Sequence, residues 1–274
     1  MSRVWIDGVL CDESDARVSP FDHGLLTGDG VFETLKVYDR VPFAARRHLE
    51  RLDVSCRGLG LPVADHGVLR EAMAAVIEAN ALDSGRIRIT LTGGVSPLGS
   101  ERGDGGPLII VAGGPLAPWP DATDVSVVPW PRNERGALAG LKTTSYGENV
   151  VALAYAKERG AGEAIFGNTI GNLCEGTGTN VFVDIGGRLI TPPLSAGCLA
   201  GVTRALVLEV TDAVEEDLPL SALAEADEAF LSSTTREVQP IRAVDGRGLP
   251  AAPGPLTTAA AEAFTALVQR DLDP

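Results

Sequence analysis

The chain is poor in lysine. Only three of its 23 basic residues are lysines, at positions 36, 142 and 157, so a reaction that needs a side-chain amine has only these candidates. Lys157 lies at the charged end of a predicted helix, where a cation is favoured near the C-terminus and stays in water. Lys36 falls in the strand-like run 31–38, so its side chain points either into a pocket or to solvent. Lys142 is therefore the strongest candidate for amine chemistry.

Other absences narrow the class of protein. The four cysteines form no CxxC pair and the histidines stand at no metal-ligand spacing, a pattern typical of reduced, buried thiols and of a chain without a metal site. No apolar run is long enough to cross a bilayer or to act as a signal peptide, which predicts a cytoplasmic protein without a membrane partner. Because the formal net charge is −14, a nucleic-acid partner is excluded and a small-molecule substrate is favoured.

The order of patterned segments predicts an α+β or α/β protein of two domains. Residues 1–113 combine strand-like runs with helices over 44–59 and 67–82, whose apolar residues recur every three or four positions. Residues 114–120 are rich in proline and glycine and are predicted to be an interdomain linker. Residues 121–274 contain further strands, a hairpin at the glycine pair 186–187 and helices over 148–159, 202–214 and 256–272.

Three segments of the second part carry candidate binding groups. Glu175 precedes a small-residue loop that leads into an apolar strand, so its carboxylate is either partly desolvated or an ordinary solvated turn residue. The loop Gly176-Thr-Gly178 lacks the third glycine of GxGxxG and precedes a strand, which argues against a dinucleotide-binding fold. Segments 199–204 and 231–237 could each bind an anion, or could simply cap a helix.

Together, these parts are what pyridoxal 5′-phosphate requires. Lys142 offers an amine for a Schiff base, Glu175 offers a carboxylate for the ring nitrogen, and the two turns offer phosphate sites. With segments 19–24, 28–34 and 48–52 they make a chain that, over nearly its whole length, resembles the class IV (fold type IV) pyridoxal-phosphate enzymes. That family includes branched-chain and D-amino acid aminotransferases, (R)-amine transaminases and 4-amino-4-deoxychorismate lyase.

The resemblance implies a fold, an assembly and a set of residue roles. The expected fold has a small N-terminal α/β domain and a larger C-terminal domain with a β-barrel-like core, in a homodimer. Lys142 would be the catalytic, Schiff-base lysine, and Glu175 would pair with the ring nitrogen. The other cofactor-binding residues would be Arg51, Val202, Thr203, Ser233 and Thr234, and the substrate-binding residues would be Phe32, Thr34, Arg88 and Thr235.

The resemblance also implies a reaction, in which an amino donor and a 2-oxo acid exchange an amino group by a ping-pong mechanism. Phe32-Glu-Thr34 resembles the deoxychorismate lyases, because branched-chain enzymes usually have glycine at the Thr34 position. Ser96-Pro97 resembles the D-amino acid aminotransferases, although Leu98 and Ser100 replace the arginine and histidine of the bacillary enzymes. A transaminase of the D-amino acid or (R)-amine type is favoured, a pyruvate-eliminating lyase is the alternative, and a branched-chain L-amino acid aminotransferase is least favoured.

Overall fold

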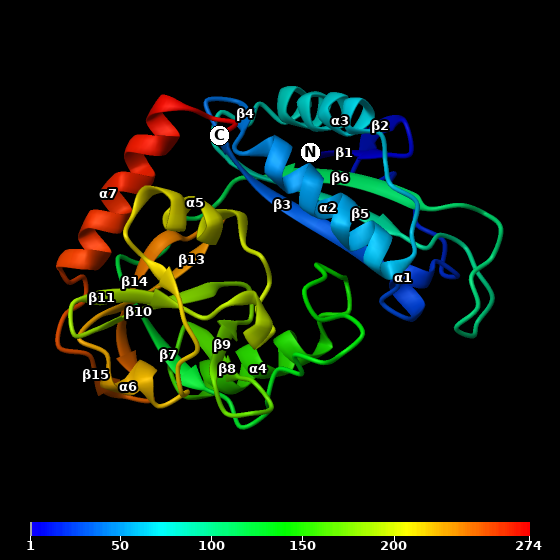
Figure 1. Cartoon of the computed structure of the whole chain (residues 1–274). Coiled ribbons are helices and arrows are strands. Elements are labelled where there is room, and N and C mark those ends of the chain that lie inside the picture. The colour runs from blue at the N-terminus through cyan, green and yellow to red at the C-terminus, as the bar shows by residue number, and fades with distance from the viewer. Residues whose placement is uncertain (1) are drawn as a thin grey trace. The chain divides into compact units, whose positions relative to one another are not determined.

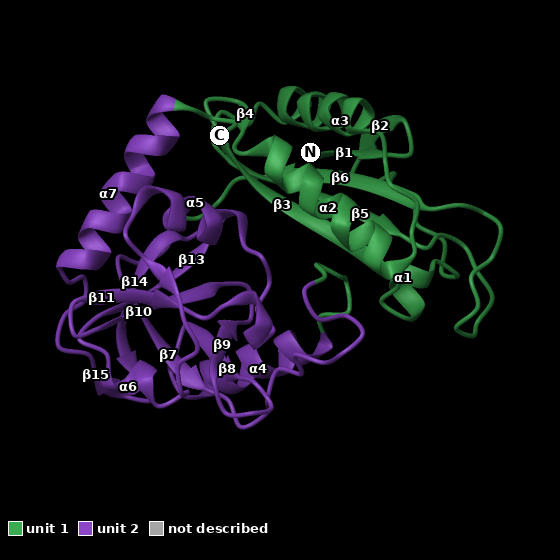
Figure 2. Ribbon diagram, in the orientation of Figure 1, with its two compact units in different colours: residues 1–117, 141–146, 271–274 green, residues 118–140, 147–270 purple. Residues whose placement is uncertain are grey.

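The structure, a computed structural model, describes residues 2–274, which divide into two compact units (Figures 1 and 2). Unit 1 consists of the chain up to Ala117 with Leu141–Tyr146 and Asp271–Pro274, and unit 2 consists of Pro118–Gly140 and Gly147–Arg270. This division differs from the predicted continuous domain 121–274, because the short segments 141–146 and 271–274 group with unit 1. The backbone explains the first of them: Phe32 N–H donates to the Lys142 carbonyl, and Thr144 N–H donates to the Gly30 carbonyl.

Unit 1 is built on a six-stranded antiparallel sheet in the order β2-β1-β6-β5-β3-β4. Its strands are β1 (Arg3–Ile6), β2 (Val9–Asp12), β3 (Gly30–Tyr38), β4 (Val41–Pro42), β5 (Gly85–Thr92) and β6 (Leu108–Gly114). In β5 the apolar Ile87 and Ile89 are buried while Arg86 and Arg88 are exposed. This alternation is typical of an antiparallel strand with one covered face.

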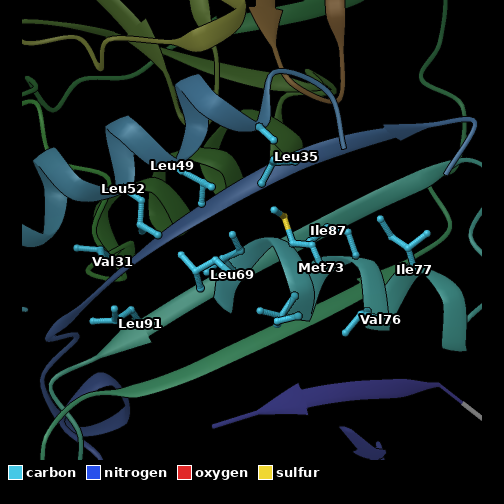
Figure 3. Packing of buried hydrophobic residues seen from close by; sticks show 14 of the residues in the cluster. Val31, Leu35, Leu49, Leu52, Leu69, Met73, Val76, Ile77, Ile87 and Leu91 are labelled. Carbon is cyan, nitrogen blue, oxygen red and sulfur yellow. The ribbon is translucent and has the colours of Figure 1, made fainter. Parts of the chain in front are cut away.

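Two helices cover the apolar face of this sheet. The helices α2 (Ala45–Leu59) and α3 (His66–Ala79) turn their leucines and Met73 towards β3 and β5, and these side chains form one core (Figure 3). Helix α2 ends at Leu59 and is followed by its C-cap, Gly60, whose left-handed φ of +72° suits glycine. Helix α3 begins at its Asp65 cap, which accepts hydrogen bonds from two backbone amides. Both predicted helices are confirmed, although α3 ends at Ala79 and a further short helix, α1, spans His23–Leu26.

Unit 2 contains a nine-stranded sheet in the order β12-β11-β10-β13-β14-β7-β8-β9, with β15 paired to β14. The pairs β14–β7, β7–β8 and β11–β12 are parallel and the others antiparallel. The strands are β7 (Thr123–Val127), β8 (Glu163–Gly167), β9 (Leu173–Gly176), β10 (Asn180–Ile185), β11 (Arg188–Thr191), β12 (Val214–Glu215), β13 (Ala229–Ser233), β14 (Glu237–Val244) and β15 (Arg247–Gly248). Their inward residues form a second apolar core.

The helices of unit 2 are α4 (Gly147–Glu158), α5 (Val202–Val210), α6 (Ala222–Glu225) and α7 (Pro255–Arg270). The hairpin at Gly186-Gly187 is confirmed as β10 and β11. The prediction of one helix over 202–214 is wrong at its end: Thr211 is extended and stops α5, and Val214–Glu215 pairs with β11 as β12 instead. Within residues 2–274, no helix combines the length and the apolar character needed to span a bilayer.

Candidate active site

The backbone of Lys142 is held from two sides within unit 1. Its N–H donates to the Ser55 hydroxyl of α2 at 3.0 Å, and its carbonyl accepts from Phe32 of β3 at 3.0 Å. The next residue, Thr143, forms an isolated β-bridge with Val31. Lys142 therefore lies in a short segment that pairs with the start of β3, although it comes from a loop far along the chain.

Two predicted site residues, Lys142 and Arg88, contact the ring of a third, Phe32. The Lys142 Nζ lies 4.4 Å from the ring centroid and the Arg88 Cζ lies 3.6 Å from it. Tyr146 adds an edge-to-face contact with a centroid separation of 5.2 Å. Thr34 faces the same side of β3, two residues along, and is paired in register with Arg88. One ring thus brings an amine and a guanidinium together on the sheet face opposite to the one that α2 and α3 cover.

Arg51, the predicted phosphate ligand, lies on α2 and binds a fully buried carboxylate. Its Nε and Nη2 donate to the two oxygens of Glu33, each at 2.7 Å, and the Nδ1 of the buried His48 lies 2.7 Å from the same carboxylate. Burial opposes ionisation of Glu33, but the charges and hydrogen bonds of Arg51 and His48 outweigh it and hold the pKa of the carboxyl far below its ordinary value. Neither Glu33 nor His48 was predicted from the sequence, although His48 and Arg51 share one helix face through their three-residue spacing.

We expect the stability of the apoprotein to fall as the pH is lowered from 8 to 4. Burial lowers the pKa of His48 from its ordinary 6.5, against the pull of Glu33, and the pKa of Glu33 is lowered from 4.5. Because both folded-state pKa values are depressed, each contribution is complete above the ordinary pKa and is lost as the pH falls, by about 1.4 kcal/mol per unit of pKa difference. Urea unfolding at each pH measures this loss.

The variant His48→Gln is the control for that pH profile. It should flatten the part of the profile between pH 6.5 and 5 and leave the decline below pH 4.5. A profile equally steep in His48→Gln and the wild type between pH 6.5 and 5 would show that His48 is not a source of the pH dependence.

In unit 2, Glu175 of β9 is largely shielded from water and lies beside one cation and one backbone amide. Its Oε2 accepts from the Leu199 N–H at 2.9 Å, and its Oε1 lies 3.4 Å from Nε of Arg132. Its side chain is 13% exposed, so the desolvated alternative holds and the solvated-turn alternative is wrong. Arg132 in turn donates to the Asn149 side chain at 2.8 Å and stacks on Phe166. Arg132 was missed because it stands in an irregular loop with no periodicity to mark it.

The start of α5 carries amides suited to an anion and lies beside the Glu175 contact. Its N-cap, Gly201, offers no side-chain cap, and a Cβ at Gly201 would come within 2.0 Å of Asn180 Oδ1, so a larger residue would displace the Asn180 side chain. Asn180 also donates to the Leu199 carbonyl at 2.9 Å. Leu199 therefore links Glu175 to the helix start that presents Val202 and Thr203.

The other predicted anion segment is a turn between two strands. Ser233 ends β13 and pairs with Glu237, which opens β14, so Thr234, Thr235 and Arg236 form the turn. The Ser233 hydroxyl accepts from the Arg236 N–H at 3.2 Å. The helix-capping alternative for 231–237 is wrong because no helix follows. The residues Ser233, Thr234 and Thr235 are half-buried at this turn.

Comparison with known proteins supports a single family. The family model described as "Amino-transferase class IV" matches residues 30–244. A Methanocaldococcus jannaschii protein named as a branched-chain-amino-acid aminotransferase is 36% identical over 260 residues, covering 89% of this chain and 88% of its own. The aminodeoxychorismate lyase of Bacillus subtilis is 31% identical, covering 88% of this chain and 86% of its own. The D-alanine aminotransferase of Staphylococcus haemolyticus is 30% identical, covering 98% and 99%.

Solved structures agree with the sequence comparison. The crystal structure of the Escherichia coli branched-chain amino acid aminotransferase superposes with a TM-score of 0.92 at 30% identity, covering 97% of this chain and 94% of that one. The predicted fold class is thereby confirmed, and so is the predicted family with its cofactor. The chain belongs to the class IV aminotransferases, enzymes of fold type IV that depend on pyridoxal phosphate.

Proposed function

We propose that this chain transfers the amino group of an amino acid to a 2-oxo acid by a ping-pong mechanism, with Lys142 as the Schiff-base lysine. The observation that carries the proposal is the shared contact of Lys142 and Arg88 with Phe32. Transamination of an amino acid needs a lysine amine that can form a Schiff base and a cation that can bind the substrate carboxylate. A guanidinium binds a carboxylate through two parallel hydrogen bonds.

The residues present fit the cofactor of the family. Glu175, flanked by the Arg132 cation and the Leu199 amide, can hold a protonated ring nitrogen. The uncapped start of α5 can hold a phosphate through its amides. The proposed phosphate ligands are Arg51, Val202, Thr203, Ser233 and Thr234. Arg51 can serve although it binds Glu33, because a guanidinium has five N–H donors.

The roles of the chain's own groups follow. Bound pyridoxal phosphate supplies a carbonyl for imine chemistry and a ring that accepts electrons. The Lys142 Nζ would act as the base that accepts the proton of the substrate α-carbon and as the acid that gives a proton back. Glu175 keeps the ring nitrogen protonated, while Arg88 holds the substrate carboxylate. Thr34 and Thr235 are proposed to line the substrate position.

For the donor, we propose the D-amino acid or (R)-amine type. The resemblance of the loop with Ser96 and Pro97 to D-amino acid aminotransferases supports this. In the structure Ser96 is buried and its hydroxyl accepts from the Gly103 N–H at 3.0 Å, which gives that loop a defined turn. Two other candidates have support. Branched-chain L-amino acids are favoured by the name of the M. jannaschii relative. A lyase is favoured by Thr34 and by the B. subtilis relative.

The absorption spectrum of the protein with pyridoxal phosphate tests these candidates. D-alanine, L-leucine, (R)-1-phenylethylamine and aminodeoxychorismate are added separately. Conversion of the cofactor to its amino form by D-alanine or the (R)-amine supports the proposal, and conversion by L-leucine alone replaces it with the branched-chain function. Pyruvate release from aminodeoxychorismate, with no donor converting the cofactor, would establish the lyase.

We expect Arg88→Met to weaken the use of amino acids selectively. Loss of a charge-assisted hydrogen bond to the substrate carboxylate should raise KM for the amino acid donor roughly 10- to 100-fold. The KM for (R)-1-phenylethylamine, which has no carboxylate, should change little. Arg86→Met, on the same exposed face of β5, is the matched control. Equal losses for both donors would remove Arg88 from the carboxylate site.

We also propose the homodimer and the cytoplasmic location that the resemblance and the composition suggest. Sedimentation velocity of the purified chain measures the first, and cell fractionation measures the second. Neither affects the assignment of the reaction.

A further inference from the structure

A buried ion pair in unit 2 takes no part in the chemistry described above. Arg236 Nη2 lies 3.5 Å from Oε2 of Glu163, and their side chains are only 6% and 3% exposed. The guanidinium also donates to the Gly162 carbonyl at 3.1 Å and to the Gln239 side chain. Trp119 covers it, with its ring centroid 3.8 Å from Cζ. These contacts therefore hold the Arg236 guanidinium in one position.

One end of this pair leads to Glu175. The Oε1 of Glu163 accepts from both the backbone N–H and the hydroxyl of Thr177, which stands two residues after Glu175. The Thr177 carbonyl accepts from the Asn149 side chain at 2.7 Å. Asn149 is also the acceptor for Arg132, the cation beside Glu175. A continuous polar chain thus runs from Glu163 to the carboxylate proposed to hold the ring nitrogen.

The other end of the pair is part of the Ser233–Arg236 turn. The Arg236 backbone N–H donates to the Ser233 hydroxyl, and its side chain anchors the turn to Glu163 of β8 and Gln239 of β14. Glu163 and Arg236 are 73 residues apart in the chain. Their pairing connects two segments through side chains. One is the turn with the proposed phosphate and substrate ligands, and the other is the loop that follows Glu175.

Stability alone gives little reason for such a pair. Moving two charges out of water is costly, and apolar residues of similar size often stabilise a protein as well or better. A buried pair does, however, fix the geometry of the segments that it joins, because each charge requires its partner.

We propose that Glu163 and Arg236 are positioning residues that set the Glu175 loop and the Ser233–Arg236 turn in one arrangement on unit 2. The ring-nitrogen partner and the hydroxyls of the turn then meet the cofactor together. This inference rests on the proposed roles of Glu175 and of the turn.

The test measures binding of pyridoxal phosphate to the apoprotein of the full chain. Four variants are compared: Glu163→Gln, Arg236→Met, Arg236→Lys and the double variant E163Q/R236M. The control is Arg242→Met, which removes a cation from β14 whose partner, Asp124, lies 2.8 Å away at the surface. The dissociation constant, the pH titration of the absorption band of the bound cofactor and the melting temperature of the apoprotein are recorded for each.

We expect Glu163→Gln and Arg236→Met to weaken cofactor binding roughly 10- to 100-fold, the loss seen when residues that support the ligands of a metal site are replaced. Both should also shift the pH titration of the absorption band. Arg236→Lys should lie between them and the wild type, because lysine keeps the charge but not the fork of donors. The double variant should lose no more than the worse single variant, since the two residues act as a unit. Arg242→Met should stay within about twofold of the wild type.

The proposal is overturned if Glu163→Gln and Arg236→Lys keep wild-type affinity and pH titration, even with a lower melting temperature, since that result describes a purely structural pair. If Arg236→Met does not fold, these two variants decide the question. A failure of the proposed function is seen elsewhere, in a wild type whose bound cofactor no donor converts.

Discussion

Replacing Lys142 by alanine is expected to reduce transamination by at least roughly 10⁴-fold. Lys142 is proposed to act both as the Schiff-base nucleophile and as the group that moves the α-proton, and positioned acid–base catalysis alone contributes about 10²–10⁴-fold. The cofactor should still bind through its phosphate ligands, but its absorption band should be that of a free aldehyde and not of an imine. Single-turnover kinetics with the best donor, together with the spectrum, measure both effects.

The lysine-poor sequence makes the controls for this experiment complete. Lys36 and Lys157 are the only other lysines, and Lys157 is exposed on α4. Lys36→Ala and Lys157→Ala should both keep the imine band. If Lys142→Ala kept that band and Lys36→Ala lost it, the assignment would move to β3, where Lys36 lies on the same side as Phe32.

Replacing Glu175 by glutamine is expected to lower kcat roughly 10²–10³-fold, as loss of one preorganised charge-stabilising group does in other enzymes. Glutamine has nearly the shape of glutamate, but it carries no negative charge to keep the ring nitrogen protonated. The change also leaves the half-buried Arg132 without its shielded partner. Steady-state kinetics with saturating donor and oxo acid measure the loss.

Glu148 is the matched control for Glu175. Its carboxylate lies 3.5 Å from Nη1 of the same Arg132, but its side chain is 77% exposed. Water screens such a surface pair, which typically contributes about 0–1 kcal/mol. Glu148→Gln should therefore keep kcat within about twofold. If both variants lost activity equally, the charge on Arg132 and not the ring nitrogen would explain the effect.

The sequence identified residues that are rare or that stand in a local motif. Lys142 was found because lysine is scarce, and Glu175 because a small-residue loop leads from it into an apolar strand. Helix and strand positions followed from apolar periodicity, which reports the face of a segment that is buried. Where a helix stops depends on weaker signals, and the extended conformation of Thr211, which ends α5, had no glycine or proline to announce it.

The sequence did not identify the pairs of charged and polar residues that form around the candidate site. Glu33 and Arg51 are 18 residues apart, Arg132 and Asn149 are 17 apart, and Glu163 and Arg236 are 73 apart. Each pair is formed by folding, and neither partner is unusual in its own local context. The turn at Ser233 shows the same limit, because its capping-box spacing lies between two strands where no helix exists.

The segment 141–146 shows that order along the chain and membership in a folded unit are different things. The chain leaves unit 1 after Ala117, returns to it for six residues with Lys142, and leaves again. In local unfolding, segments that are hydrogen-bonded into one unit open together, whether or not they are neighbours in the sequence. The Thr144 amide proton, which is bonded to the Gly30 carbonyl, should therefore exchange with solvent together with those of β3 during local unfolding. A gene divided after Ala117 would encode a first product that lacks the segment of unit 1 containing Lys142.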